Sequence, residues 1–158
     1  MIPSTSYLLS VAGLGVSLAG FSGLVAAFRR GATWQRIDAY RLRQIPEMGL
    51  AASFLAFVTL PLADTVHDPA TVLRIAAGAG LLFSVLHMLA LLLRMRRLEI
   101  HLSGPRWAVV VIVDLVVVLT GAVALGSATV AAYEWLLAVM LARPMLAFVL
   151  VLADVAEA

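Results

Sequence analysis

Residues 107–126 decide the fold: they read WAVVVIVDLVVVLTGAVALG, and Asp114 is their only charged side chain. The hydrocarbon core of a bilayer is about 30 Å thick, and a helix needs roughly 20 apolar residues to cross it. Five stretches of the chain meet this requirement, at 7–28, 45–63, 75–93, 107–126 and 135–153. The fold class we expect is all-α: a polytopic transmembrane helical bundle of about five spans, forming a single transmembrane domain over residues 1–158.

The composition of the whole chain also indicates that most of it is surrounded by lipid rather than by water. Of its 158 residues, 63% are hydrophobic and 13% are charged, and the mean hydropathy is +1.06. Soluble domains are about 45–50% apolar and about 25% charged, so this composition excludes a soluble globular enzyme. The absence of Cys excludes disulfides, thiolate catalysis and Cys-based metal sites. The net charge of +2 is too small and too scattered for a nucleic-acid-binding surface.

Arginines in the connecting loops predict the orientation of the chain. There is no Lys, and most of the 11 basic residues fall in the first and third predicted loops: Arg29, Arg30, Arg36, Arg41, Arg43, Arg94, Arg96, Arg97 and Arg106. Cytoplasmic loops carry an excess of positive charge. We therefore expect a multi-pass protein of the bacterial inner membrane with its N-terminus outside and its C-terminus in the cytoplasm. The bacterial origin is inferred from the exclusive use of Arg and the abundance of Ala and Val, which are typical of GC-rich genomes.

The first loop has the pattern of a short interfacial helix near residues 33–43. A threonine suited to helix capping opens the segment, and apolar residues then recur at near-helical spacing. Arg29, Arg36 and Arg43 lie seven residues apart, hence on one helix face. We expect these arginines and Trp34 to contact lipid headgroups, as interfacial helices do. A solvated turn with positive-inside charge explains the same residues equally well.

Small residues form rows along the first span. One row is Ser6, Ser10, Gly13, Ser17 and Gly20, and a second is Gly15, Ala19, Gly23 and Ala27. Shorter rows occur on the third span (Ala76, Gly80, Ser84) and on the fourth (Gly121, Ala124). Helices in lipid associate by close approach over small residues, so we expect the first helix to be a central packing helix. The rows fit packing within the chain or against another protomer.

Three ionisable residues inside the predicted spans form a candidate intramembrane polar layer: His87, Asp114 and Arg143. Counted from the cytoplasmic ends of their spans, they lie at a depth of about 10 to 15 Å. Ionisable groups at such depth are costly and are candidates for function. We expect a structural ion pair between Asp114 and Arg143. The alternative is a proton or solute path in which Asp114 titrates and His87 acts as a relay.

Other polar and aromatic residues lie near the ends of the predicted spans. Glu47 is close to the start of the second span, where the helix dipole favours a carboxylate. Trp and Tyr side chains are enriched at membrane–water interfaces. We therefore expect Glu47 to stabilise a helix start, and Tyr7, Trp107, Tyr133 and Trp135 to anchor the spans at the interfaces.

The sequence contains no motif for a zinc protease, a phosphate-binding loop, a dinucleotide site or an EF-hand. We therefore expect no catalytic residue, no cofactor and no metal. Gly20-Phe21-Ser22-Gly23 resembles the GxSG segment of rhomboid intramembrane serine proteases. That resemblance implies Ser22 as nucleophile and His87 as base. We prefer close helix packing, because rhomboids have more spans and hold this dyad towards the outer side.

A longer pattern covers mainly the first 65 residues. It comprises GFSGLVAAFRR from Gly20 to Arg30, followed by Trp34, Asp38, the run Arg41-Leu42-Arg43, and Pro61 after an apolar stretch. This pattern resembles a family of small, uncharacterised bacterial multi-pass inner-membrane proteins. The resemblance implies a location and a topology, and it implies no activity, substrate or catalytic residue.

Together these features predict an integral inner-membrane protein without catalytic activity that serves as a packing or interaction subunit of a membrane assembly. Its expected partners are the lipid bilayer and either a second copy or another membrane protein, with no nucleic acid. The alternative is a small proton- or solute-translocating protein that uses His87, Asp114 and Arg143. Transporters usually contain repeated halves, and five spans do not divide equally.

Overall fold

The computed structural model describes residues 2–28, 36–97 and 105–156, and these residues form five helices. The helices are α1 (Thr5–Phe28), α2 (Arg36–Thr65), α3 (Pro69–Arg97), α4 (Pro105–Ser127) and α5 (Val130–Ala156). No strand occurs in these described segments. The predicted all-α fold class is confirmed.

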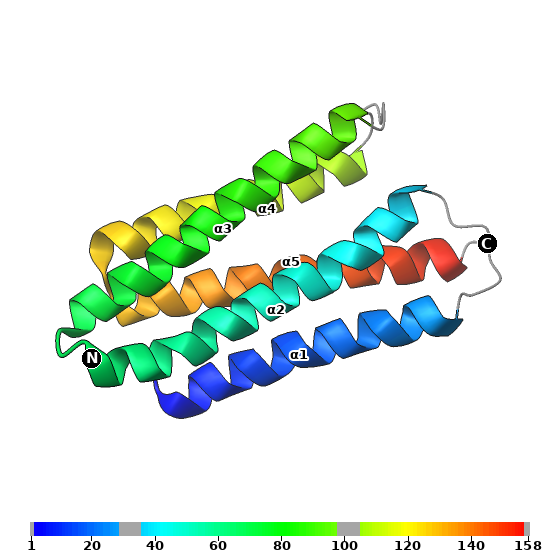
Figure 1. The fold of residues 1–158 in the computed structure, drawn as a ribbon. Coiled ribbons are helices and arrows are strands. Elements are labelled where there is room, and N and C mark those ends of the chain that lie inside the picture. Colours follow the sequence, from blue (N-terminus) through cyan, green and yellow to red (C-terminus); the bar gives the residue numbers. More distant parts are fainter. Residues whose placement is uncertain (1, 29–35, 98–104, 157–158) are drawn as a thin grey trace.

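The helices lie side by side in one elongated bundle (Figure 1). The start of α1 and the end of α5 are at opposite ends of this bundle, as expected for an odd number of crossings. The two central helices are α2, which packs on α1, α3 and α5, and α5, which packs on all four others. Among the described residues α1 contacts only α2 and α5. It is therefore an edge helix, and the prediction that it is a central packing helix is wrong.

Four helices are long and apolar enough to cross a membrane, over Thr5–Ala27, Leu42–Thr65, Pro69–Arg94 and Val130–Val149. These spans are compatible with an integral membrane protein. In α4 the apolar segment is the shorter Val111–Ser127. The whole of α4 has 23 residues, which corresponds to about 34 Å of helix. That α4 crosses the bilayer as a fifth span stays a prediction.

The separate interfacial helix near 33–43 is not present in the part of this segment that the structure describes. Residues 36–43 are the first two turns of α2, which continues through Pro46 and Pro61 to Thr65. Proline removes one backbone hydrogen bond inside a helix, but neighbouring helices hold such a helix together in a membrane bundle. Residues 33–35 lie outside the described residues, as do the side chains of Arg29, Trp34 and Arg36.

The backbones of α1 and α2 approach closely at Gly15 and Gly49. A Cβ on Gly49 would lie 2.7 Å from the carbonyl oxygen of Gly15, and a Cβ on Gly15 would clash with Gly49 O and the Ser53 hydroxyl. Ser53 also donates a 2.8 Å hydrogen bond to Ala12 O across this contact. Glycine at both positions therefore lets the two backbones touch, which is the usual basis of helix association in lipid.

The other rows of small residues divide between the inside and the outside of the bundle. The rows on α3 and α4 pack inside it, where a Cβ on Gly80 would meet Leu55 at 3.1 Å and one on Gly121 would meet Leu81 at 3.3 Å. The longer row on α1 points away from the other helices and is exposed along its whole length: Ser6, Ser10, Gly13, Ser17 and Gly20. This face of α1 has no packing partner among the described residues.

Candidate functional site

The centre of the polar site is an ion pair between two neighbouring helices. Arg143 of α5 donates a 2.8 Å hydrogen bond from Nη2 to Oδ2 of Asp114 on α4, and its Nε faces Oδ1 of the same carboxylate. Both side chains are buried, with 5% of Arg143 and 7% of Asp114 exposed. The pair thus combines one charge-assisted hydrogen bond with a second close contact between the charged groups. The Asp114–Arg143 contact that the sequence predicts is present.

His87 of α3 joins the same guanidinium from the opposite side. Arg143 Nη1 lies 2.9 Å from His87 Nε2. The imidazole ring stacks on Phe83, one turn earlier in α3, with a centroid separation of 5.8 Å. The structure therefore brings together all three members of the predicted polar layer, His87, Asp114 and Arg143, from α3, α4 and α5.

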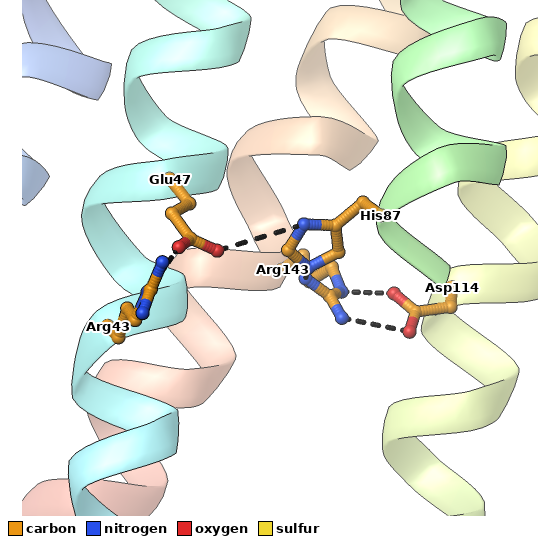
Figure 2. A network of polar contacts seen from close by, with 5 residues as sticks. All are labelled: Arg43, Glu47, His87, Asp114 and Arg143. Carbon is orange, nitrogen blue, oxygen red and sulfur yellow. Dashed lines mark hydrogen bonds and ion pairs between the residues drawn. The ribbon is translucent and has the colours of Figure 1, made fainter. Parts of the chain in front are cut away.

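Glu47 of α2 extends this cluster towards the end of the bundle. Its Oε2 lies 3.9 Å from His87 Nδ1, and its Oε1 pairs with Arg43 Nε at 2.6 Å (Figure 2). The interpretation of Glu47 as a helix-start carboxylate is wrong, because α2 begins at Arg36, three turns earlier. Arg43 pairs with Glu47, four residues away on the same helix face. Its predicted contact with lipid headgroups stays a prediction.

Exposure falls steadily along this chain of five residues. The exposed fraction of the side chain is 63% at Arg43, 31% at Glu47 and 11% at His87, before the buried pair. A polar route therefore leads from the end of the bundle with the arginines to its interior. The cluster is suited chemically to neutralising buried charge, because the Asp114 carboxylate and the Arg143 guanidinium balance each other.

This polar route ends at an apolar core. On α5, Leu136, Leu137 and Met140 are fully buried between Arg143 and Tyr133. Tyr133 starts a separate polar cluster, in which its hydroxyl lies 2.8 Å from the Thr59 hydroxyl and donates to Leu55 O at 3.1 Å. The prediction that Tyr133 is an interface anchor is wrong, since its side chain is fully buried.

Two other predicted anchors remain near the surface of the bundle. Trp135 is 66% exposed, as an interfacial residue would be. Tyr7 is half-buried and donates a 2.8 Å hydrogen bond to Glu134 O, which joins the start of α1 to the start of α5. The side chain of Trp107 lies outside the described residues.

The serine of the GxSG segment is not part of this site. Ser22 is buried and donates a 2.7 Å hydrogen bond to Ala19 O in its own helix. Among the described residues α1 and α3 make no contact, so the structure does not bring Ser22 and His87 together as a nucleophile and a base. Within the same residues, no three His, Asp or Glu side chains are grouped in a way that could hold a metal ion.

Comparisons with protein-family models, with curated proteins and with solved structures give no match to this chain. The resemblance of the first 65 residues to a family of bacterial membrane proteins therefore stays a prediction.

Proposed function

We propose that this protein is a non-catalytic integral protein of the bacterial inner membrane that acts as a packing or interaction subunit of a membrane assembly. The observation that carries the proposal is the enclosed Asp114–Arg143 pair. Each charge is balanced by the other, and the pair links α4 to α5 inside the bundle. A buried pair of this kind fixes which helices meet, at some cost in desolvation.

The end of the polar route in an apolar core supports a structural role over transport. A proton or solute path has to reach both membrane surfaces. Here Arg143 and Tyr133 are ten positions apart on α5, about 15 Å of helix, and the fully buried residues between them are apolar. The hydroxyl pair of Tyr133 and Thr59 is therefore a second, separate cluster.

The exposed row of small residues on α1 supports the interaction role. A Cβ at Gly13 or Gly20 would meet nothing within 4 Å, so these glycines serve no close approach inside the chain. Small residues at a lipid-facing position allow another transmembrane helix to come close. The expected arrangement places the N-terminus outside and the end with most arginines in the cytoplasm, following the positive-inside rule.

Replacing the two open glycines tests this role directly. The variant Gly13→Leu/Gly20→Leu should keep the helical circular dichroism of the wild type, because both positions are open, and should lose the protein that copurifies in mild detergent. Ala79→Leu, also at an exposed position but on α3, is the matched control and should keep it. Blue native electrophoresis with mass spectrometry distinguishes a second copy from another membrane protein. A wild-type protein that is monomeric and without a protein partner in nanodiscs contradicts the proposal.

A second candidate function is proton or solute translocation, and the graded exposure from Arg43 to His87 favours it. In that case Asp114→Asn/Arg143→Gln should fold normally and abolish a pH-dependent flux into proteoliposomes. If the wild-type protein shows no flux above that of empty liposomes, this candidate is excluded.

A further inference from the structure

A cleft of about 230 Å³ opens between α2 and α3 at the end of the bundle where α3 finishes. Its apolar wall consists of Phe83, Leu86, Ala90 and Leu91, all from α3. These positions recur at helical spacing and so share one face of the helix. Leu86 is 55% exposed and continues the wall onto the lipid-facing surface. The cleft is therefore open to a molecule that arrives from the bilayer.

The polar lining of the cleft includes one positive charge, that of Arg94, with which no described carboxylate pairs. Its polar members are Glu47, His87 and Arg94. The Glu47 carboxylate is already paired with Arg43, and His87 Nε2 is occupied by Arg143. Arg94 has no hydrogen-bond or ion-pair partner among the described residues. It is also the last residue of the apolar span Pro69–Arg94, so its guanidinium lies at the level where headgroups are expected.

We infer that this cleft binds one anionic phospholipid of the leaflet at the arginine-rich end, with the headgroup phosphate on Arg94 and an acyl chain along Phe83 and Leu86. A guanidinium binds phosphate through two parallel hydrogen bonds. The apolar wall below Arg94 suits a chain that hangs from that phosphate. A free phosphate ion would use Arg94 alone and leave the wall unused. This site does not depend on the packing role proposed above.

Lipid retention by the purified full-length chain tests the site. Native mass spectrometry in detergent, titrated with phosphatidylglycerol and with phosphatidylcholine, should show one tightly held phosphatidylglycerol. Arg94→Gln should weaken its binding about fivefold to tenfold, which is the expected effect of one arginine near anionic headgroups. Arg74→Gln, at an exposed position on the opposite end of α3, is the matched control and should bind like the wild type.

A variant that fills the cleft without changing the charge distinguishes lipid binding in the cleft from lipid attraction to the charged surface in general. Ala90→Phe should reduce phosphatidylglycerol binding to a similar extent, whereas Ala79→Phe, at an exposed position on the same helix, should not. Equal loss in Arg94→Gln and Arg74→Gln, or full binding in Ala90→Phe, overturns the proposal. Competition by inorganic phosphate at the concentration of the lipid also overturns it, because the ligand would then be the free ion.

Discussion

Arg143 Nη1 and His87 Nε2 lie 2.9 Å apart, and this contact fixes the tautomer of the imidazole. A guanidinium only donates hydrogen bonds, and its proton cannot be removed in a protein. Nε2 must therefore be the acceptor, and the ring proton is on Nδ1, which faces Glu47 Oε2 at 3.9 Å. The structure thus requires a neutral His87 with its proton on Nδ1.

This assignment can be checked by ¹⁵N NMR of the imidazoles in the detergent-solubilised protein. The sequence has three His residues, and the signal missing in His87→Gln identifies the relevant one. We expect the neutral Nδ1–H pattern for His87 at neutral pH. An Nε2–H tautomer or a cationic ring would show that the contact with Arg143 is absent in the membrane protein.

Removing one member of the buried Asp114–Arg143 pair should destabilise the protein more than removing both members together. Arg143→Gln leaves the Asp114 carboxylate buried without its cation. Asp114→Asn leaves the Arg143 guanidinium buried without its anion. Each single change should lower the free energy of unfolding by about 3 kcal/mol, the typical result when one partner of a buried pair is lost. Asp114→Asn/Arg143→Gln should lose less than either single variant. The measurement is unfolding in mixed micelles, followed by circular dichroism; additive losses in the double variant would contradict a structural pair.

The contact between α1 and α2 should depend on one glycine. Gly15→Ala places a Cβ against Gly49 O and the Ser53 hydroxyl, and overpacking of this kind costs about 1–3 kcal/mol. Gly13→Ala adds the same methyl group to open space on the same helix and should leave stability unchanged or slightly higher. The same unfolding measurement compares the two. Equal effects would show that α1 does not approach α2 as closely as described.

The start of α3 should loosen in acid because of Asp68. Hydrogen bonds from the Thr71 hydroxyl and from the backbone amides of Thr71 and Ala70 lower the pKa of the Asp68 carboxyl below its ordinary value. The folded pKa is thus below the unfolded one, so this cap stabilises fully above the unfolded pKa and is lost as the pH falls through the folded pKa. The protection factor of the Thr71 amide, which is its intrinsic exchange rate divided by its measured rate at each pH, should fall over that range of pH. In Asp68→Asn, whose side chain still caps, the protection factor should lack this acid-dependent fall, and the same fall in Asp68→Asn would contradict the assignment.

The sequence predicted where the five long helices lie, because a bilayer imposes one length and one composition on its spans. It also predicted the Asp114–Arg143 contact, because two opposite charges in one layer of consecutive antiparallel helices have few other partners, and a long Arg side chain can cover the remaining difference in depth. The single helix from Arg36 to Thr65 was missed. The first turns of this helix are polar, so a hydropathy pattern assigns them to a loop outside the span. The backbone nevertheless continues as one helix through both parts.

Two site residues, Glu47 and Tyr133, were misinterpreted, each for a different reason. Glu47 was assigned from its position in the predicted span, although the spacing of four residues from Arg43 was a visible signal of pairing. Tyr133 was assigned from its place near a span end. Its buried partner Thr59 belongs to α2, and no local pattern indicates that α2 and α5 meet there. Contacts between central helices depend on packing, which one sequence does not encode locally.

The order in which the helices are synthesised gives the polar cluster a further consequence. Asp114 and His87 belong to α4 and α3, whereas the guanidinium that pairs with both belongs to α5, which leaves the ribosome after these two helices. Until α5 is inserted, a carboxylate remains in the interior of the bundle with no cation beside it. A chain interrupted after α4 therefore lacks the cation that balances Asp114, and the polar cluster is complete only when α5 has packed against α3 and α4.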